Sequence, residues 1–257
     1  RAWHLTADQA EPLVRHAVDA GVTLFDTADM YDRGASEEAT GTLLRRLFAH
    51  RDDYVLATKV YFPLREGVTN AGGLSRKHVL SAIDGSLRRL GVDHVDLYYV
   101  HVDDLSTPLE ETLEALAGLV AAGKTRYLGW SNVQTWRLER IRQLCDRYGW
   151  PAPVALQQEH SYLRPHPGQH NLSVVDAEQL RYLRAHDDLT LVAYSPILKG
   201  AYADAAKQRD HAIMDTYRGA DSEARLATVQ KVAADLGVTG NQLVLAWLLH
   251  QDDPQRV

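Results

Sequence analysis

The 257-residue chain contains a single cysteine, Cys145, so it cannot form an intramolecular disulfide framework. It also lacks a long apolar run, because none approaches the roughly 18 residues that a membrane-spanning helix needs. Its formal charge of −6 is modest and its Lys and Arg residues are scattered, which excludes a basic surface of the kind that binds nucleic acid. We therefore expect a cytoplasmic protein with no membrane or nucleic-acid partner.

Glycine-rich phosphate-binding motifs are missing as well. No G-x-G-x-x-G follows a strand-like segment, so the fingerprint of a Rossmann dinucleotide site is absent. The stretch GLVAAGKT, residues 118–125, matches the pattern G-x-x-x-x-G-K-[ST], but a phosphate loop must follow a strand and open a helix. Here the order is reversed, because an apolar helix stripe precedes Gly123 and a strand follows Lys124. We predict a helix end and reject a nucleoside triphosphate site.

The chain does contain a regular alternation of short apolar runs and longer amphipathic stretches. The apolar runs are rich in β-branched residues and Tyr, which is typical of parallel strands buried on both faces. The predicted strands cover residues 22–28, 54–60, 94–101, 125–132, 154–161 and 189–196. Helix signals lie between them: Thr6 and Gly21 bracket one helix, Ser75 and Gly91 a second, and Thr107 and Gly123 a third.

Repeated strand and helix units suit either an open doubly wound sheet or a closed barrel. The two differ in where polar chemistry gathers, since a barrel collects side chains from the C-terminal ends of many strands. Polar residues stand late in or just beyond each predicted strand: Asp26 and Tyr31, Lys59, His101, Ser131 and Asn132, Gln157 and Glu159, and Tyr194 and Ser195. This distribution favours an α/β fold of the (β/α)8 TIM barrel type.

Four of these residues make chemical sense together. A Tyr hydroxyl is a poor acid at neutral pH, and a nearby Lys ammonium lowers its pKa by favouring the phenolate. Asp26 is placed to hold the Lys59 ammonium. A carbonyl oxygen between the Tyr31 hydroxyl and a His101 N–H would be polarised for attack at carbon and then protonated by Tyr31. Taken alone, His101 equally suits a hydrogen-bonded core position.

At these residues the sequence resembles the aldo-keto reductase family, and the resemblance runs along nearly the whole chain. The segment GVTLFDTADMY is similar to the strand and loop that carry the family's catalytic Asp and Tyr, LATKV to the strand with its Lys, and DHVDLYYVH to the strand with its His. The resemblance implies that Asp26, Tyr31, Lys59 and His101 form the catalytic tetrad. It also implies an oxidoreductase that reduces an aldehyde or ketone.

Further segments resemble the family's cofactor site, which holds the dinucleotide in an extended pose at the barrel mouth. YLGWSN and ALQQEHS resemble the stretches around the nicotinamide carboxamide, and LVAYSPILKG resembles the stretch whose aromatic ring stacks on the nicotinamide. The resemblance implies a cofactor-binding set of Asp26, Ser131, Asn132, Gln157, Tyr194, Ser195, Pro196, Leu198 and Gly200. It implies NADPH (NADP+), while NADH stays open because the family's 2′-phosphate segment is absent from the chain.

The predicted strands are fewer than a complete barrel needs. A barrel has eight strands and the sequence supplies six, with the first and last barrel strands missing. We expect residues 1–257 to form a single barrel domain that is incomplete at both ends, because the sequence is an excerpt of a longer chain. Omitted internal loops are the alternative.

The substrate pocket and metal binding have weaker signals. Tyr61 and Trp130 are predicted to line a pocket for a small-molecule carbonyl substrate, although Trp130 equally suits packing inside the barrel. His160, His166 and His170 read as solvated loop residues without a carboxylate at ligand spacing, so no metal site is expected.

Two functional classes follow from the sequence. The first is an NADPH-dependent carbonyl reductase with Tyr31 as proton donor. The second is a cofactor-binding regulatory or sensor protein on the same fold, similar to the potassium-channel β subunits. An intact tetrad favours the enzyme, since a sensor has less need of an activated proton donor.

Overall fold

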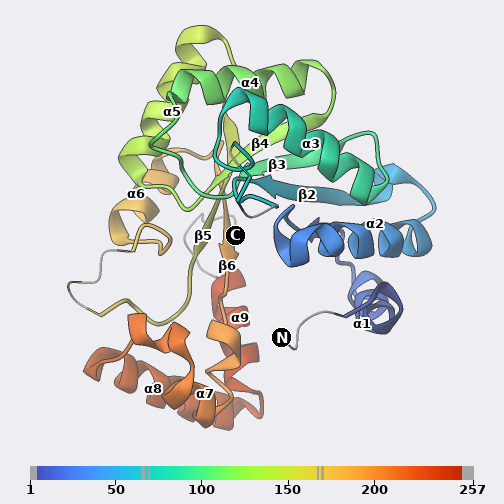
Figure 1. The fold of residues 1–257 in the computed structure, drawn as a ribbon. Helices are drawn as coiled ribbons and strands as arrows, with labels where there is room; N and C mark the ends of the chain where they lie inside the picture. Colours follow the sequence, from blue (N-terminus) through green and yellow to red (C-terminus); the bar gives the residue numbers. More distant parts are fainter. Residues whose placement is uncertain (1–4, 65–66, 69, 167, 169–170, 251–257) are drawn as a thin grey trace. The chain divides into compact units, whose positions relative to one another are not determined.

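The computed structural model describes residues 5–64, 67–68, 70–166, 168 and 171–250 (Figure 1). Contacts group the chain into two compact units, one formed by Arg1–Ser131 and Trp136–Val154 and the other by Asn132–Thr135 and Ala155–Val257. That residues 1–257 form a single domain stays a prediction.

The first unit holds four parallel strands whose order in the sheet is their order in the chain. Strand β1 (Leu24–Asp26) pairs with β2 (Val55–Val60), β2 with β3 (Val95–Val100), and β3 with β4 (Thr125–Ser131). All residues of β3 are buried, as a strand covered on both faces requires. A doubly wound sheet reverses its strand order at one point, and no reversal occurs among these four strands. Their sequential order is that of a (β/α) barrel.

Helices alternate with these strands: α1 (Ala7–Asp19), α2 (Ala35–Leu47), α3 (Arg76–Leu90), α4 (Leu109–Ala121) and α5 (Thr135–Tyr148). Helix α2 packs against α3, and α3 against α4, so that they lie side by side along the strands (Figure 1). The predicted starts of α1 and α3 are confirmed, because Thr6 and Ser75 accept hydrogen bonds from the backbone N–H three residues on.

Helix α4 corrects one predicted cap and confirms its predicted end. Thr107 does not cap the helix: Pro108 is the N-cap, and the Thr107 hydroxyl donates to Asp104 Oδ2 at 2.7 Å. The helix thus begins one residue later than the predicted cap implies, and the Thr107 hydroxyl is turned toward Asp104. At the other end Gly123 has φ +71°, the left-handed conformation that stops a helix, and β4 begins two residues later. The interpretation of GLVAAGKT as a helix end is confirmed.

The second unit holds most of β5 (Pro153–Glu159), which pairs in parallel with β6 (Thr190–Tyr194). All the predicted strands are thus present, with β1 reduced to three residues. The helices of this unit are α6 (Ala177–Ala185), α7 (Ala205–Asp210), α8 (Ala220–Leu236) and α9 (Gly240–Leu249). One buried apolar cluster joins the loop after β6 to α8 and α9; it contains Leu163, Leu198, Ala201, Tyr202, Met214, Tyr217, Val229 and Val244.

Over the described part of the chain, no single helix is long and apolar enough to cross a membrane. Helices α8 and α9 meet the length and composition requirements only as a pair, with a 96° bend between them.

Candidate active site

Three of the four predicted catalytic residues stand where neighbouring strands of the first unit end. Asp26 is the last residue of β1, Lys59 lies one residue before the end of β2, and His101 directly follows β3. Backbone pairing continues past the strands, because the His101 N–H donates to the Val60 carbonyl at 2.9 Å. Parallel strands end at one edge of a sheet, so the three side chains gather there.

Lys59 is the buried centre of this group. Its side chain is 0% exposed, and its Nζ donates to Asp26 Oδ2 at 2.5 Å and to the Thr27 carbonyl at 2.8 Å. Burial disfavours the ammonium and lowers the pKa of Lys59, while the Asp26 carboxylate opposes that shift. The sequence predicted this pairing of Asp26 with Lys59, and the structure has the contact.

Tyr31 lies above the Lys59 ammonium and remains accessible. It is 39% exposed and begins the 3₁₀ turn η1 (Tyr31–Gly34). Its ring centroid is 5.0 Å from Lys59 Nζ and 5.6 Å from the His101 ring, which it meets edge to face. Asp32 (φ 48°) and Arg33 (φ 54°) follow in the left-handed region, a strained conformation that side chains other than glycine adopt rarely and mostly at functional sites.

His101 is held as a neutral ring. Burial, followed by the positive charge of Lys59, lowers the pKa of His101 to about 4. Its ring also meets Phe62 edge to face at 5.1 Å. A neutral imidazole keeps one N–H donor, so His101 can hydrogen-bond a carbonyl oxygen without bringing a second positive charge next to Lys59.

Asp104 lies in the loop that follows His101 and connects it to the loop that follows Tyr61. Its carboxylate accepts from Leu74 N at 3.0 Å, from Ser106 N at 2.8 Å and from the hydroxyls of Ser106 and Thr107. The Gly73 N–H in turn donates to the Tyr61 carbonyl at 2.7 Å. Burial acts to raise the pKa of Asp104, but these hydrogen bonds outweigh it and lower the pKa to about 2.

A neighbouring ion pair fastens the same loop to α5. Arg137 donates to both carboxylate oxygens of Asp103, at 3.0 and 3.3 Å, and to the Asp104 carbonyl at 3.2 Å. Both charged side chains are largely buried, at 13% and 11% exposure. The loop that begins at His101 is therefore tied down on two sides.

The predicted cofactor residues divide between the units. Ser131, at the end of β4, is 1% exposed in the first unit, whereas the second unit contains the others apart from Asp26. There the Tyr194 hydroxyl donates to Asn132 Oδ1 at 2.8 Å, and the Asn132 N–H donates to the Gln157 carbonyl at 3.4 Å. Asn132, Gln157 and Tyr194 thus form one bonded group.

The loop after β6 has an unusual backbone. Ser195, Leu198 and Lys199 have φ values of 50°, 46° and 60°, and Gly200 has φ 93°. Each left-handed residue other than glycine costs roughly 1 kcal/mol or more, and such strained residues cluster at functional sites. Lys207 Nζ donates to the Lys199 carbonyl at 2.9 Å, which puts a cation beside this backbone. A strained loop with a nearby ammonium fits the phosphates of a dinucleotide.

Comparison with known proteins decides the family. The sequence model of the Aldo/keto reductase family matches residues 1–257. The chain belongs to the aldo/keto reductase family. The fold of this family is the (β/α)8 barrel, and the structure contains parallel strands and helices of that fold. Membership also supports a general role as an oxidoreductase.

Relatives of this aldo/keto reductase carry several names. It is 31% identical to the versiconal hemiacetal acetate reductase of Aspergillus parasiticus, over 97% of this chain and 77% of that protein. It is 32% identical to the L-glyceraldehyde 3-phosphate reductase of Escherichia coli strain K12, over 97% and 74%. It is also 31% identical to a probable voltage-gated potassium channel subunit beta of Oryza sativa subsp. japonica, over 95% and 75%.

The two predicted pocket residues differ in accessibility. Tyr61 is partly buried and meets Phe62 edge to face at 5.0 Å, and it is Phe62 that contacts the His101 ring. Trp130 is 0% exposed, so it packs in the interior of the first unit and lines no open surface. Its place in a substrate pocket stays a prediction.

One histidine expectation is wrong. His160 is only 8% exposed, because it follows β5 into the second unit and its ring faces Trp247 at 6.0 Å. His166 is exposed as predicted, and His170 lies outside the described residues. In the described ranges no group of His, Cys, Asp or Glu is arranged to hold a metal ion.

Sequence reasoning missed several residues around the tetrad. Asp29, Tyr99, Asp104 and Arg137 all contact it or its loops, and none stands out by residue type. The run Asp104-Leu105-Ser106-Thr107 was the one usable signal, since an Asp followed by Ser and Thr commonly forms local side-chain to backbone bonds.

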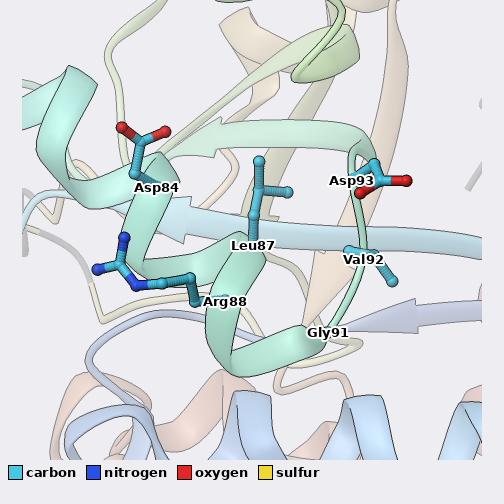
Figure 2. Close-up of a pocket in the computed structure, with 6 residues that line it drawn as sticks. All are labelled: Asp84, Leu87, Arg88, Gly91, Val92 and Asp93. Atoms are coloured by element: carbon cyan, nitrogen blue, oxygen red, sulfur yellow. The ribbon is translucent and has the colours of Figure 1, made fainter.

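A surface depression of about 450 Å³ lies elsewhere in the first unit (Figure 2). It is lined by Asp84, Leu87, Arg88, Gly91, Val92 and Asp93, at the end of α3 and before β3 begins. The tetrad stands at the opposite end of β3, so this depression is not part of the candidate active site.

Proposed function

We propose that this aldo/keto reductase is a cytoplasmic NADPH-dependent enzyme that reduces a small aldehyde or ketone to an alcohol. One observation carries the proposal: Lys59, fully buried, contacts Asp26 at 2.5 Å and lies 5.0 Å from the ring of the accessible Tyr31. A buried ammonium beside a solvent-facing phenol is an arrangement for activating a proton donor.

Tyr31 donates the proton in this proposal. As negative charge develops on the substrate oxygen, the Tyr31 hydroxyl transfers its proton, and Lys59 stabilises the phenolate that remains. Asp26 holds Lys59 in place and offsets the cost of burying its charge. His101, kept neutral by burial and by Lys59, donates a hydrogen bond that orients the carbonyl oxygen.

The proposed cofactor is NADPH, with NADH as the alternative. A bound nicotinamide would supply hydride chemistry, and the residues named below would hold it. Ser131, Asn132 and Gln157 are the residues proposed for the carboxamide, and Tyr194 for the face of the ring. Ser195, Pro196, Leu198 and Gly200 belong to the strained loop proposed for the pyrophosphate, and the membership in the family supports a nicotinamide cofactor in general.

The test is steady-state oxidation of NADPH with a panel of aldehydes and ketones. We expect turnover by the wild-type protein and a loss of about 10²-fold or more in the Tyr31→Phe variant, which keeps the ring but not the proton. The Tyr127→Phe variant is the matched control, because Tyr127 is 56% exposed on β4 and has no proposed role. If Tyr31→Phe reduced carbonyls as fast as wild type, Tyr31 would not be the donor. Repeating the assay with NADH measures cofactor preference.

A second candidate function follows from the relative named as a potassium channel β subunit. In that case the chain binds the nicotinamide cofactor as a regulatory or sensor protein. Cofactor binding measured by fluorescence, without turnover on any carbonyl of the panel, would favour this role over the enzyme.

A further inference from the structure

Asp29 is a buried carboxyl group that the proposed reaction does not use. It lies between Asp26 and Tyr31 in the sequence and is 0% exposed. Among the described residues, no side chain makes a hydrogen bond to either of its carboxylate oxygens, and the adjacent Met30 N–H is the one donor that favours its ionised form. Burying an ionised carboxylate without an ion-pair partner costs free energy of folding, so such a group favours its protonated, neutral form.

The tetrad lies directly beside Asp29. The Asp29 N–H donates to the carbonyl of Lys59 at 3.3 Å, which joins the Asp29 loop to the strand that carries the ammonium. Tyr31 follows Asp29 by two residues, and its N–H donates to the Ala28 carbonyl at 3.1 Å in the same short loop. The Asp29 charge also acts on Lys59 directly, because it opposes the lowering of the Lys59 pKa by burial.

The other ionisable groups that face Asp29 act in both directions, since Glu37 raises the pKa of Asp29 while Arg89 and Lys59 lower it. Glu37 on α2 is 0% exposed and adds a like charge, while its oxygens accept from Thr58 Oγ1 and Arg89 Nε at 2.6 Å each. Arg89 on α3 is thereby engaged with Glu37. Tyr98 on β3 is buried as well, and its hydroxyl has no hydrogen-bond partner among the described residues. Burial, and then the charge of Glu37, raises the pKa of Asp29 to about 7.

We propose that Asp29 is a positioning residue for the proton donor, which acts on Tyr31 through the charge of Lys59. This inference rests on the proposed role of Tyr31. While Asp29 is neutral, the Lys59 ammonium acts fully on the Tyr31 hydroxyl. Once Asp29 is ionised, its negative charge offsets that ammonium, the phenolate is less favoured and Tyr31 becomes a weaker acid. The enzyme therefore reduces carbonyls better below neutral pH than above it.

The direct test measures the Tyr31 pKa without any turnover. The protein has twelve Tyr residues, so the titration of Tyr31 is isolated as the difference in phenolate absorbance between each protein and its Tyr31→Phe counterpart. In wild type, Asp29 is ionised before Tyr31 titrates. The Asp29→Asn variant removes that negative charge, and we expect it to lower the Tyr31 pKa by about one pH unit. An unchanged Tyr31 pKa would overturn the proposal.

A matched carboxyl serves as the control. Asp96 is 8% exposed on β3, but it accepts from Arg51 at 2.6 Å and from Leu56 N at 2.8 Å, near the opposite ends of the strands. Asp96→Asn removes a buried carboxylate without touching the tetrad, so the Tyr31 pKa should stay as in wild type. Should Asp29→Asn fail to fold, Asp29→Ser removes the same charge with the same expected direction.

The pH profile of turnover is the second readout. In the wild-type protein kcat for reduction should fall through an inflection near neutral pH, and Asp29→Asn should lose that inflection while its activity at low pH stays within about threefold of wild type. An inflection that persists in Asp29→Asn contradicts the proposal. If no carbonyl is turned over but the Tyr31 pKa still falls in Asp29→Asn, the proposed reduction fails and the coupling of Asp29 to Tyr31 stands.

Discussion

The hydroxyl of Tyr194 donates a hydrogen bond to Oδ1 of Asn132, with 2.8 Å between the two atoms. Asn132 has φ 52°, in the left-handed region that Asn tolerates better than most residues other than glycine. The bond turns the Asn132 amide so that Oδ1 faces Tyr194, which fixes the direction of the Nδ2 donors. Tyr194 thus has two proposed tasks, one for its ring and one for its hydroxyl.

Replacing Tyr194 with Phe separates these tasks. The ring stays available for stacking, while the bond to Asn132 is lost. A neutral hydrogen bond contributes about 0.5–1.5 kcal/mol, so we expect the Kd for NADPH to rise about three- to tenfold, as measured by quenching of protein fluorescence. The Tyr148→Phe variant, at a tyrosine stacked on Trp150 in the first unit, should bind NADPH as wild type does. Unaltered binding by Tyr194→Phe would show that the hydroxyl has no part in holding the cofactor.

The strand framework was predictable from the sequence because apolar runs and helix caps are local signals. Ser75 and Gly91 bracket α3 as predicted, since a side-chain oxygen and a left-handed glycine act within one turn of the chain. Thr107 is not the cap of α4, because the helix begins after Pro108 and the Thr107 hydroxyl bonds Asp104 in the preceding loop. The position of that carboxylate depends on the folded loop.

The candidate site was predictable only as far as residue order along the strands reveals it. Asp26 and Lys59 end neighbouring parallel strands, so their proximity follows from the fold. The burial of Asp29 and His160 does not, because both follow strands in segments that read as polar loops, and their surroundings come from residues far away in the chain. Packing against residues that are distant in the sequence determines the exposure of Asp29 and His160, so local composition does not predict it.

The buried lysine gives a sharp test of the tetrad. Lys59→Met replaces the ammonium with an apolar chain of similar length, so the protein should fold, while kcat/KM for carbonyl reduction should fall by about 10²–10⁴-fold. Lys124→Met is the matched control. Lys124 also contacts an aspartate at 2.5 Å, namely Asp84 of α3, but both side chains are partly exposed. We expect Lys124→Met to keep kcat/KM within about twofold of wild type. Equal losses in the two variants would argue against a special role for Lys59.

The hydrogen bonds to Asp104 predict that the free energy of unfolding falls at acidic pH. Asp104 has its pKa lowered to about 2, so its contribution to stability is present above the ordinary value of 3.8 and is lost as pH falls through about 2. Asp104→Asn weakens the bonds to Ser106, Thr107 and Leu74 N, and should lower the free energy of unfolding at pH 7 by about 1–3 kcal/mol. Urea unfolding at pH 7 and at pH 2 measures this. A deficit as large at pH 2 as at pH 7 would contradict the assignment.

The contribution of Asp29 to the free energy of unfolding should change with pH in the opposite direction to that of Asp104. Its pKa is raised from 3.8 to about 7, so between these values the folded protein holds a proton that the unfolded chain has released. The free energy of unfolding therefore falls as pH rises through this window. Asp29→Asn cannot release a proton, so its stability relative to wild type should increase from pH 4 to pH 7, by on the order of 3 kcal/mol, and then level off.

Urea unfolding of wild type and Asp29→Asn at half-unit steps from pH 4 to pH 8 measures this difference without reference to catalysis. Asp96→Asn breaks a carboxylate that has charged and backbone donors, so it should destabilise the protein at pH 7, where Asp29→Asn stabilises it. A constant difference between Asp29→Asn and wild type across the range would mean that the Asp29 carboxyl is ionised throughout. Its negative charge would then offset Lys59 at every pH, and the neutral-pH control of Tyr31 would have no physical basis.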